Sequence, residues 1–237
     1  MTRLAGVDGC KSGWVVASAT LGSGGRFTRV TCTVVRTFDD VLPLADVIAV
    51  DIPIGLAPSA EPGGRLVDRL ARKRLGGRAT SVFAAPIRGV LKCSTYTEAL
   101  AVSRASGAHG LGLSKQTFNI TPKIREVDER MTPELQRRVF ESHPELVFTV
   151  MRRERPCAHN KKTPEGRKER LDALPAVLRR SADGAMSRLA RRDALPDDII
   201  DAHALLWSAR RRAIGTAERL PADPPRDARG LAMEMWV

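Results

Sequence analysis

Four segments in the first 53 residues have the hydrophobic patterns of β-strands. Two apolar segments flank the short stretch GCKSG and predict a β-hairpin, and a third segment alternates valine and cysteine with threonine, as a half-buried strand does. These three segments are residues 3–9, 14–20 and 27–37. The run VIAVDIP at 47–53 is apolar until it reaches Asp51, which is typical of a central strand covered on both faces.

Helical signals follow in the rest of the chain. Pro122 and Pro144 each stand where a helix can begin, because the first helical position does not need a backbone N–H. Pro175 is expected to break or kink the helix that opens at Thr163. The sequence therefore predicts helices near 65–75 and 97–106, from 121, 144 and 163, and over about 197–214, with strands at 138–142 and in the terminal GLAMEMWV.

The order of these elements predicts an α/β domain. A three-stranded meander precedes a buried strand, and helices, another strand and a long helix follow, so we expect one mixed central sheet flanked by helices. No internal repeat and no clear linker divides the sequence. We therefore expect a single domain over 1–237, with helical insertions around 60–135 and 150–195.

Composition indicates a globular, cytoplasmic protein. Hydrophobic residues make up 43% of the chain, which is enough for a core, and the apolar runs are too short to cross a membrane. The N-terminus enters a strand pattern at once, without a secretory signal. The four cysteines form no CxxC pair, so we expect neither a disulfide framework nor a zinc site, and a reducing cytosol is the simplest location.

Positive charge is concentrated in two stretches of the sequence. The net charge is +12; residues 64–78 contain six basic residues and one acid, and residues 152–170 contain eight basic residues and three acids. Such concentrations favour a polyanionic partner, of which nucleic acid is the commonest. The ordinary explanation, a solvated helix face, stays open for both stretches, and no feature indicates the oligomeric state.

Carboxylates stand at the ends of predicted strands and on the last helix. Asp8 ends the first strand, Asp51 ends the buried strand and Glu141 lies in the later strand. Asp198 and Asp201 lie three residues apart and so share a helix face. Each acid has an ordinary explanation, since Asp8 can form a turn and Asp198 can favour the helix dipole. Together they can converge at the edge of the sheet, where Mg²⁺ or Mn²⁺ would offset their repulsion.

Seven motifs, in order, resemble one protein family. They are GVDGCKSGW, VDIPIGL, RATSVFAAPIR, SKQTFNITPKIREVDE, FESHPELVF, DDIIDA and GLAMEMWV, and they span nearly the whole chain. The set resembles the family called domain of unknown function 429, whose members are predicted RNase H-like nucleases, and the last helix looks like that of RuvC-type nucleases. The resemblance implies an RNase H-like fold and metal-ligand roles for Asp8, Asp51, Asp198 and Asp201.

The resemblance also suggests the remaining site residues. Glu141 is expected to complete the catalytic acids, with Glu145 as the alternative acid of the same segment. Gly6 and Gly9 leave room for a backbone or a phosphate to approach Asp8. The residues expected to contact a substrate phosphate are Lys11, Ser12, Arg78, Lys115 and Lys123.

The expected function is a divalent-metal-dependent nuclease that hydrolyses phosphodiester bonds in nucleic acid, with Mg²⁺ or Mn²⁺ as cofactor. One alternative is an ATP-dependent phosphotransferase or ATPase of the actin-like branch, which shares the strand-Asp-Gly opening. Such enzymes normally need two related domains and a second glycine-rich phosphate loop, and this sequence has only one convincing opening motif. The other alternative is a non-catalytic module that binds nucleic acid.

Overall fold

The computed structural model describes all of the chain, Met1–Val237, and contains two compact units. The first unit consists of Met1–Asp51, Arg138–Glu218 and Trp236–Val237, and the second consists of Ile52–Arg137 and Arg219–Met235. Neither unit is continuous in sequence. None of the helices combines the length and the apolar character that a membrane crossing requires.

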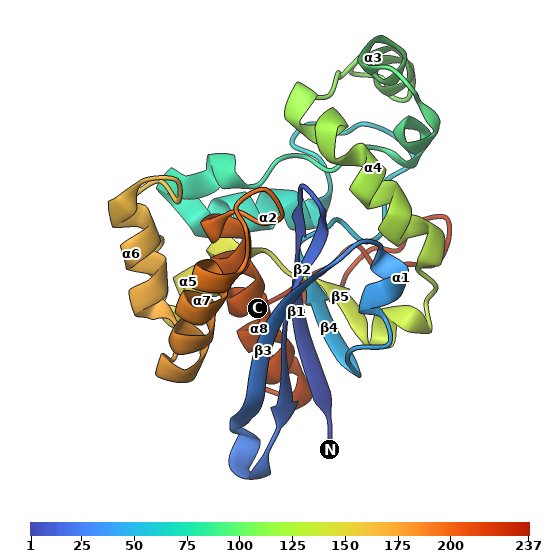
Figure 1. Ribbon diagram of the computed structural model, residues 1–237. Helices are drawn as coiled ribbons and strands as arrows, with labels where there is room; N and C mark the ends of the chain where they lie inside the picture. The colour runs from blue at the N-terminus through green and yellow to red at the C-terminus, as the bar shows by residue number, and fades with distance from the viewer. The chain divides into compact units, whose positions relative to one another are not determined.

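The first unit is built on a five-stranded mixed sheet in the order β3-β2-β1-β4-β5 (Figure 1). Its strands are β1 (Arg3–Cys10), β2 (Gly13–Leu21), β3 (Phe27–Val35), β4 (Val47–Val50) and β5 (Val139–Glu141). The first three pair antiparallel as a meander, and β4 lies between β1 and β5, parallel to both. This arrangement confirms the predicted α/β class, the hairpin and the central position of the apolar strand.

Helices flank this sheet. They are α1 (Phe38–Val41), α5 (Pro144–Met151), α6 (Pro164–Ala173), α7 (Ala176–Arg188) and α8 (Pro196–Ala213). The long helix α8 packs on β1, β2 and β4, and α7 packs on β3 and α8. Pro175 separates α6 from α7, as predicted, because proline can begin a helix but cannot continue one without losing a hydrogen bond.

One glycine determines how closely α8 approaches the sheet. A Cβ atom at Gly6 would lie 2.0 Å from the backbone nitrogen of Leu206 and 2.2 Å from the carbonyl oxygen of Ala202. Only glycine therefore lets the backbones of β1 and α8 touch here. Alternate residues of a strand share a face, so Asp8 points to the same side of the sheet as α8. Gly6 thus makes room for a helix backbone at this point.

The second unit is mainly helical. It contains α2 (Leu66–Leu75), α3 (Tyr96–Ala105) and α4 (Lys115–Arg130), with short 3₁₀ segments at Gly76–Ser81, Arg88–Lys92 and Leu135–Arg137. The two-stranded sheet of β6 (Arg219–Leu220) and β7 (Met235–Trp236) also belongs to this unit, except for Trp236. A small core joins α3, α4 and the second 3₁₀ segment around Ile87, Val90, Cys93 and Ala99.

Two boundaries in these last elements differ from the prediction. The helix predicted to open at Thr121 begins at Lys115, because the Ser114 hydroxyl oxygen accepts a hydrogen bond from the backbone N–H of Thr117 at 3.0 Å and caps the helix there. Pro122 is therefore inside α4 and does not begin it. The predicted terminal strand GLAMEMWV is reduced to the two residues of β7.

Candidate active site

Asp8 lies inside β1, and the hairpin turn is formed by Lys11 and Ser12, so the interpretation of Asp8 as a turn former is wrong. Its side chain is almost fully buried, with 8% of the residue exposed. Burial, and then the negative charges of Asp51 and Asp201, raise the pKa of Asp8 well above its ordinary value of 3.8. The charges of three predicted site acids therefore act on Asp8: those of Asp51, Asp201 and, more weakly, Asp198.

Asp51 directly follows β4, and its backbone N–H donates to the carbonyl oxygen of Val7 in β1 at 3.1 Å. The adjacent parallel strands thereby bring Asp51 next to Asp8 at their carboxyl ends. Burial raises the pKa of Asp51, the positive charges of His143 and Lys161 oppose the rise, and the charge of Glu145 adds to it.

The two aspartates of α8 differ in their surroundings. Asp198 Oδ2 accepts a hydrogen bond from the backbone N–H of Leu195 at 2.9 Å, so the ordinary helix-end explanation applies to it, although its charge also raises the pKa of Asp8. Asp201 is 1% exposed, and burial raises its pKa to about 6 although Lys161 opposes the rise. Asp201 Oδ2 accepts a hydrogen bond from Lys161 Nζ at 2.6 Å, whereas Oδ1 is buried and has no hydrogen-bond partner.

Lys161 is the main site residue that the sequence did not reveal. It lies in the loop between α5 and α6, and the charge of Asp201, followed by those of Asp8 and Asp51, raises the pKa of the ammonium group. In the sequence it is one of eight basic residues between positions 152 and 170, and its carboxylate partner is 40 positions away. No local pattern marks it.

Glu145 approaches the cluster from the first turn of α5. Its Oε1 accepts hydrogen bonds from Nε and Nη2 of the buried Arg170 at 2.9 and 2.6 Å, while Oε2 is buried without a partner. The charge of Glu145 raises the pKa of both Asp51 and Asp201. Glu141 is buried in β5, paired in register with the last residue of β4. The charge of Glu145 therefore acts on the cluster, and Glu141 stays a predicted catalytic acid.

The predicted phosphate contacts are divided between the two units. In the first unit Lys11 is exposed, and the Ser12 hydroxyl donates to Asp193 Oδ1 at 3.1 Å. In the second unit Arg78 is half-buried in a 3₁₀ segment, Lys115 is exposed with its ammonium 5.9 Å from the ring centre of Tyr96, and Lys123 is half-buried in α4. Only Lys11 and Ser12 therefore belong to the unit that holds the acidic cluster.

The basic segment 64–78 has a largely structural use within the second unit. Arg65 and Asp68 form a buried ion pair at 2.7 Å, with each side chain 1% exposed. Arg69 donates to the carbonyl oxygen of Gly64 at 2.6 Å, and Arg72 donates to that of Val82 at 3.0 Å. At least three of the six basic residues of this segment thus bind protein groups.

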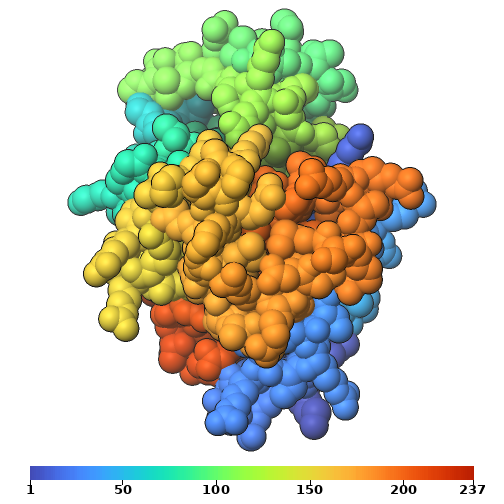
Figure 2. Space-filling view, turned by 60° about the vertical axis from the view of Figure 1, so that its left-hand side comes forward, coloured from blue at the N-terminus to red at the C-terminus, as the bar shows by residue number.

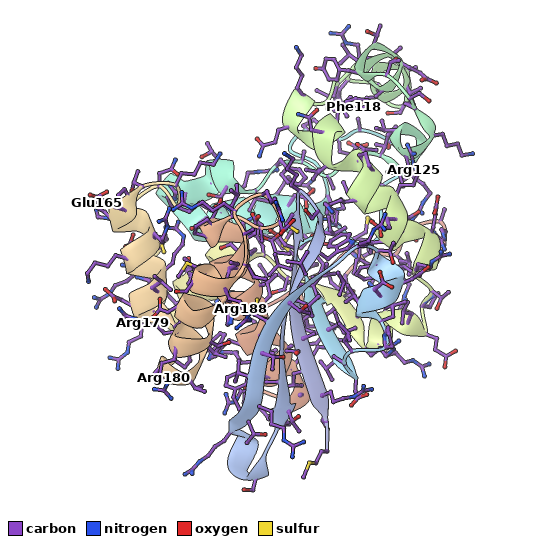
Figure 3. The ribbon with its side chains drawn as sticks, viewed as in Figure 1. Phe118, Arg125, Glu165, Arg179, Arg180 and Arg188 are labelled. Atoms are coloured by element: carbon purple, nitrogen blue, oxygen red, sulfur yellow. The ribbon has the colours of Figure 1, made fainter.

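The basic segment 152–170 lies in the first unit and keeps exposed cations. Figure 2 shows the face formed by α6 and α7 in yellow and orange. The helix α7 follows this segment and carries further arginines, of which Figure 3 labels Arg179, Arg180 and Arg188. Several cations of the segment are paired with carboxylates: Arg152, Lys161, Lys168 and Arg170. Others are exposed and make no ion pair: Arg153, Arg155 and Lys162.

The acids of the cluster are in electrostatic contact but do not form a preformed ligand set. No group of three or more His, Cys, Asp or Glu side chains is arranged to hold a metal ion. The Lys161 ammonium provides positive charge at Asp201 instead. Two carboxylate oxygens, Asp201 Oδ1 and Glu145 Oε2, remain buried without hydrogen bonds, which is costly unless a cation or a polar group approaches them.

Comparison with known proteins identifies one match. The model of a family described as "Protein of unknown function (DUF429)" matches residues 6–226. No curated protein and no solved structure matches the chain.

Proposed function

The chain belongs to the DUF429 family, and from its acidic cluster we propose that it is a divalent-metal-dependent nuclease that hydrolyses phosphodiester bonds in nucleic acid. The observation that supports this proposal is a set of buried aspartates that raise one another's pKa beside two buried carboxylate oxygens that lack hydrogen bonds. Such a set is unfavourable by itself, and its most direct use is to bind a cation.

The sheet topology is consistent with an RNase H-like fold, which forms part of the proposal. An antiparallel three-stranded meander is followed by two strands parallel to β1. Asp8 and Asp51 lie at or just beyond the carboxyl ends of adjacent parallel strands, which is where open α/β sheets commonly place their sites. The helix α8 supplies Asp198 and Asp201, and the charges of both act on Asp8.

The residues present fit a hard cation, because every candidate ligand is a carboxylate oxygen. Asp8, Asp51 and Asp201 would hold Mg²⁺ or Mn²⁺, with Asp198 as the fourth ligand. A bound cation of this kind supplies a nucleophile from water at neutral pH and stabilises charge on the phosphoryl oxygens. Asp201 Oδ1 is the clearest candidate for a ligand atom, because it is buried and accepts no hydrogen bond from the protein.

The chain's own cations would hold the polyanionic substrate. Arg153, Arg155 and Lys162 are exposed in the loop that joins α5 to α6, the same loop that carries Lys161 to the cluster. Contacts from such residues to phosphates would position the nucleic acid without reading its sequence.

A cleavage assay tests the proposal. Labelled single- and double-stranded DNA and RNA are incubated with the parent protein in Mg²⁺, Mn²⁺ or EDTA, and with the variants Asp8→Asn and Asp183→Asn. Asp183 is an exposed aspartate on α7 outside the cluster and serves as the matched control. We expect metal-dependent cleavage that Asp8→Asn reduces by orders of magnitude and Asp183→Asn preserves. Equal cleavage by Asp8→Asn and the parent would overturn the proposal.

A further inference from the structure

A lysine from the surface reaches into the buried acidic cluster. Lys161 Nζ lies 2.6 Å from Asp201 Oδ2, and the side chain of Lys161 is 35% exposed while that of Asp201 is 1% exposed. The flexible four-carbon stem of a lysine allows this, because it separates the ammonium group from the backbone of the surface loop. The pair therefore joins a solvent-accessible loop to a buried anion.

The sequence around this lysine builds a turn that holds it in place. Asn160 Oδ1 accepts a hydrogen bond from the backbone N–H of Lys162 at 3.0 Å, and the Asn160 carbonyl oxygen accepts from the N–H of Thr163 at 3.0 Å. A Cβ atom at Gly166 would lie 1.9 Å from that carbonyl oxygen, so glycine is needed for the turn to lie against α6. The position of Lys161 is thus fixed by its neighbours on both sides.

The charges around Lys161 come from several elements. Its ammonium group is favoured by Asp201 on α8, Asp8 on β1 and Asp51 after β4. These are the same carboxylates that would hold a divalent cation. A divalent cation at Asp201 Oδ1 would repel the ammonium group that Oδ2 of the same carboxylate holds at 2.6 Å, so each cation lowers the affinity of the carboxylate for the other.

We propose that Lys161 is a resident counter-ion that a divalent cation must displace from Asp201, so that this lysine sets the metal affinity of the site. The inference rests on the proposed function, because it assumes that the cluster is a cation site. It explains how the carboxylates remain folded together before the metal binds, and why their arrangement is not yet that of a ligand set. The cost of breaking a charge-assisted hydrogen bond then appears as weaker metal binding.

Metal binding to the variant Lys161→Met tests the inference. Methionine keeps the length and apolar stem of the side chain but removes its charge. Binding of Mn²⁺ is measured by calorimetry for the parent, for Lys161→Met and for Lys162→Met, in which the neighbouring exposed lysine is changed as a matched control. We expect Lys161→Met to bind Mn²⁺ about 10- to 100-fold more tightly than the parent. Lys162→Met should bind as the parent does.

The possible results separate this inference from the proposed function. Tighter binding by Lys161→Met supports the inference, and it does so even if the parent binds no Mn²⁺, a result that would by itself refute the metal-dependent function. Equal binding by the parent and Lys161→Met refutes the inference and leaves the proposed function standing. Weaker binding by Lys161→Met also refutes it, since the lysine would then assist the metal. Absence of binding in all three proteins refutes both.

A second measurement uses the parent protein alone and does not depend on the folding of a variant. The rate at which an amine-reactive acylating reagent modifies each lysine is determined by mass spectrometry with and without Mn²⁺. Displacement predicts that Mn²⁺ increases the modification of Lys161, while Lys162 serves as the internal reference. A rate at Lys161 that stays constant over a Mn²⁺ titration that saturates the protein would overturn the inference.

Discussion

Replacement of Asp201 by asparagine should remove part of the pH dependence of stability. The pKa of Asp201 in the folded protein is about 6, against an ordinary value of 3.8. A raised pKa means that the folded state favours the protonated acid, so the contribution of Asp201 to stability is complete below pH 3.8 and is lost as the pH rises through about 6. At 1.36 kcal/mol per pH unit, the full loss is about 3 kcal/mol.

The measurable part of this change lies between pH 8 and pH 5. Over this interval the folded parent should gain about 1.4 kcal/mol from protonation of Asp201, a gain that Asp201→Asn lacks. Urea unfolding in EDTA at both pH values gives the free energy of unfolding for each protein. Groups outside the acidic cluster cancel when the variant is subtracted from the parent, whereas Asp8 and Lys161 interact with Asp201 and contribute to the difference.

The exposed control Asp183→Asn should follow the parent at both pH values. If Asp201→Asn and the parent gain or lose the same free energy between pH 8 and pH 5, then Asp201 is not held in an unfavourable ionised state. The electrostatic argument for the acidic cluster would then be refuted. If the difference is present, saturating Mn²⁺ should flatten the pH profile of the parent, because a cation that binds the ionised acids competes with protons.

Three further predictions concern other parts of the first unit. His203 is fully buried on α8, where its ring nitrogens lie next to the Ile199 carbonyl oxygen and the Ser181 hydroxyl. Burial lowers the pKa of His203 to about 4. The free energy of unfolding of the parent should therefore fall by about 3 kcal/mol as the pH falls from above 6.5 to 4. In urea unfolding, His203→Gln should lose less free energy of unfolding over the same pH range. Equal losses in the variant and the parent would contradict this prediction. Arg170→Met should lower the free energy of unfolding by about 3–5 kcal/mol, because it leaves Glu145 buried without its ion pair. A melting temperature equal to that of the parent would show that the ion pair is dispensable. Neutralising Arg153 and Lys162 together should weaken binding to a labelled DNA duplex at low salt and reduce its salt dependence, whereas an unchanged slope in a salt titration would exclude them from phosphate contact.

The secondary structure was predictable wherever a local pattern determines it. The apolar segments on either side of GCKSG identified β1 and β2, alternation identified β3, the continuous apolar run identified β4, and proline marked the starts of α5 and α6. The start of α4 was misplaced because Pro122 was interpreted as a first helical residue, while the capping signal at Ser114 stands eight positions earlier. Proline is accommodated in the interior of this helix, which a local rule does not foresee.

The candidate site was predictable only in part, for a different reason. The aspartates were selected because they end strands or share a helix face, and those are properties of the sequence. Lys161 is placed by the turn around Asn160 and by a partner on α8, so its role depends on contacts between distant segments. The role of Glu145 likewise depends on distant segments, because Arg170 binds its carboxylate and its charge acts on Asp51.

The contact between Gly6 and α8 also has a consequence for the order in which the protein is synthesised. The helix backbone that covers Gly6, at Ala202, lies 196 positions further along the chain and is translated later. At about 5–20 residues per second, the ribosome needs on the order of 10–40 s to proceed from one to the other. Throughout that interval Asp8 exists on a nascent chain without Asp198 or Asp201, and a product truncated before α8 would leave the backbone of β1 uncovered at this position. The acidic cluster can therefore assemble only after α8 has been synthesised.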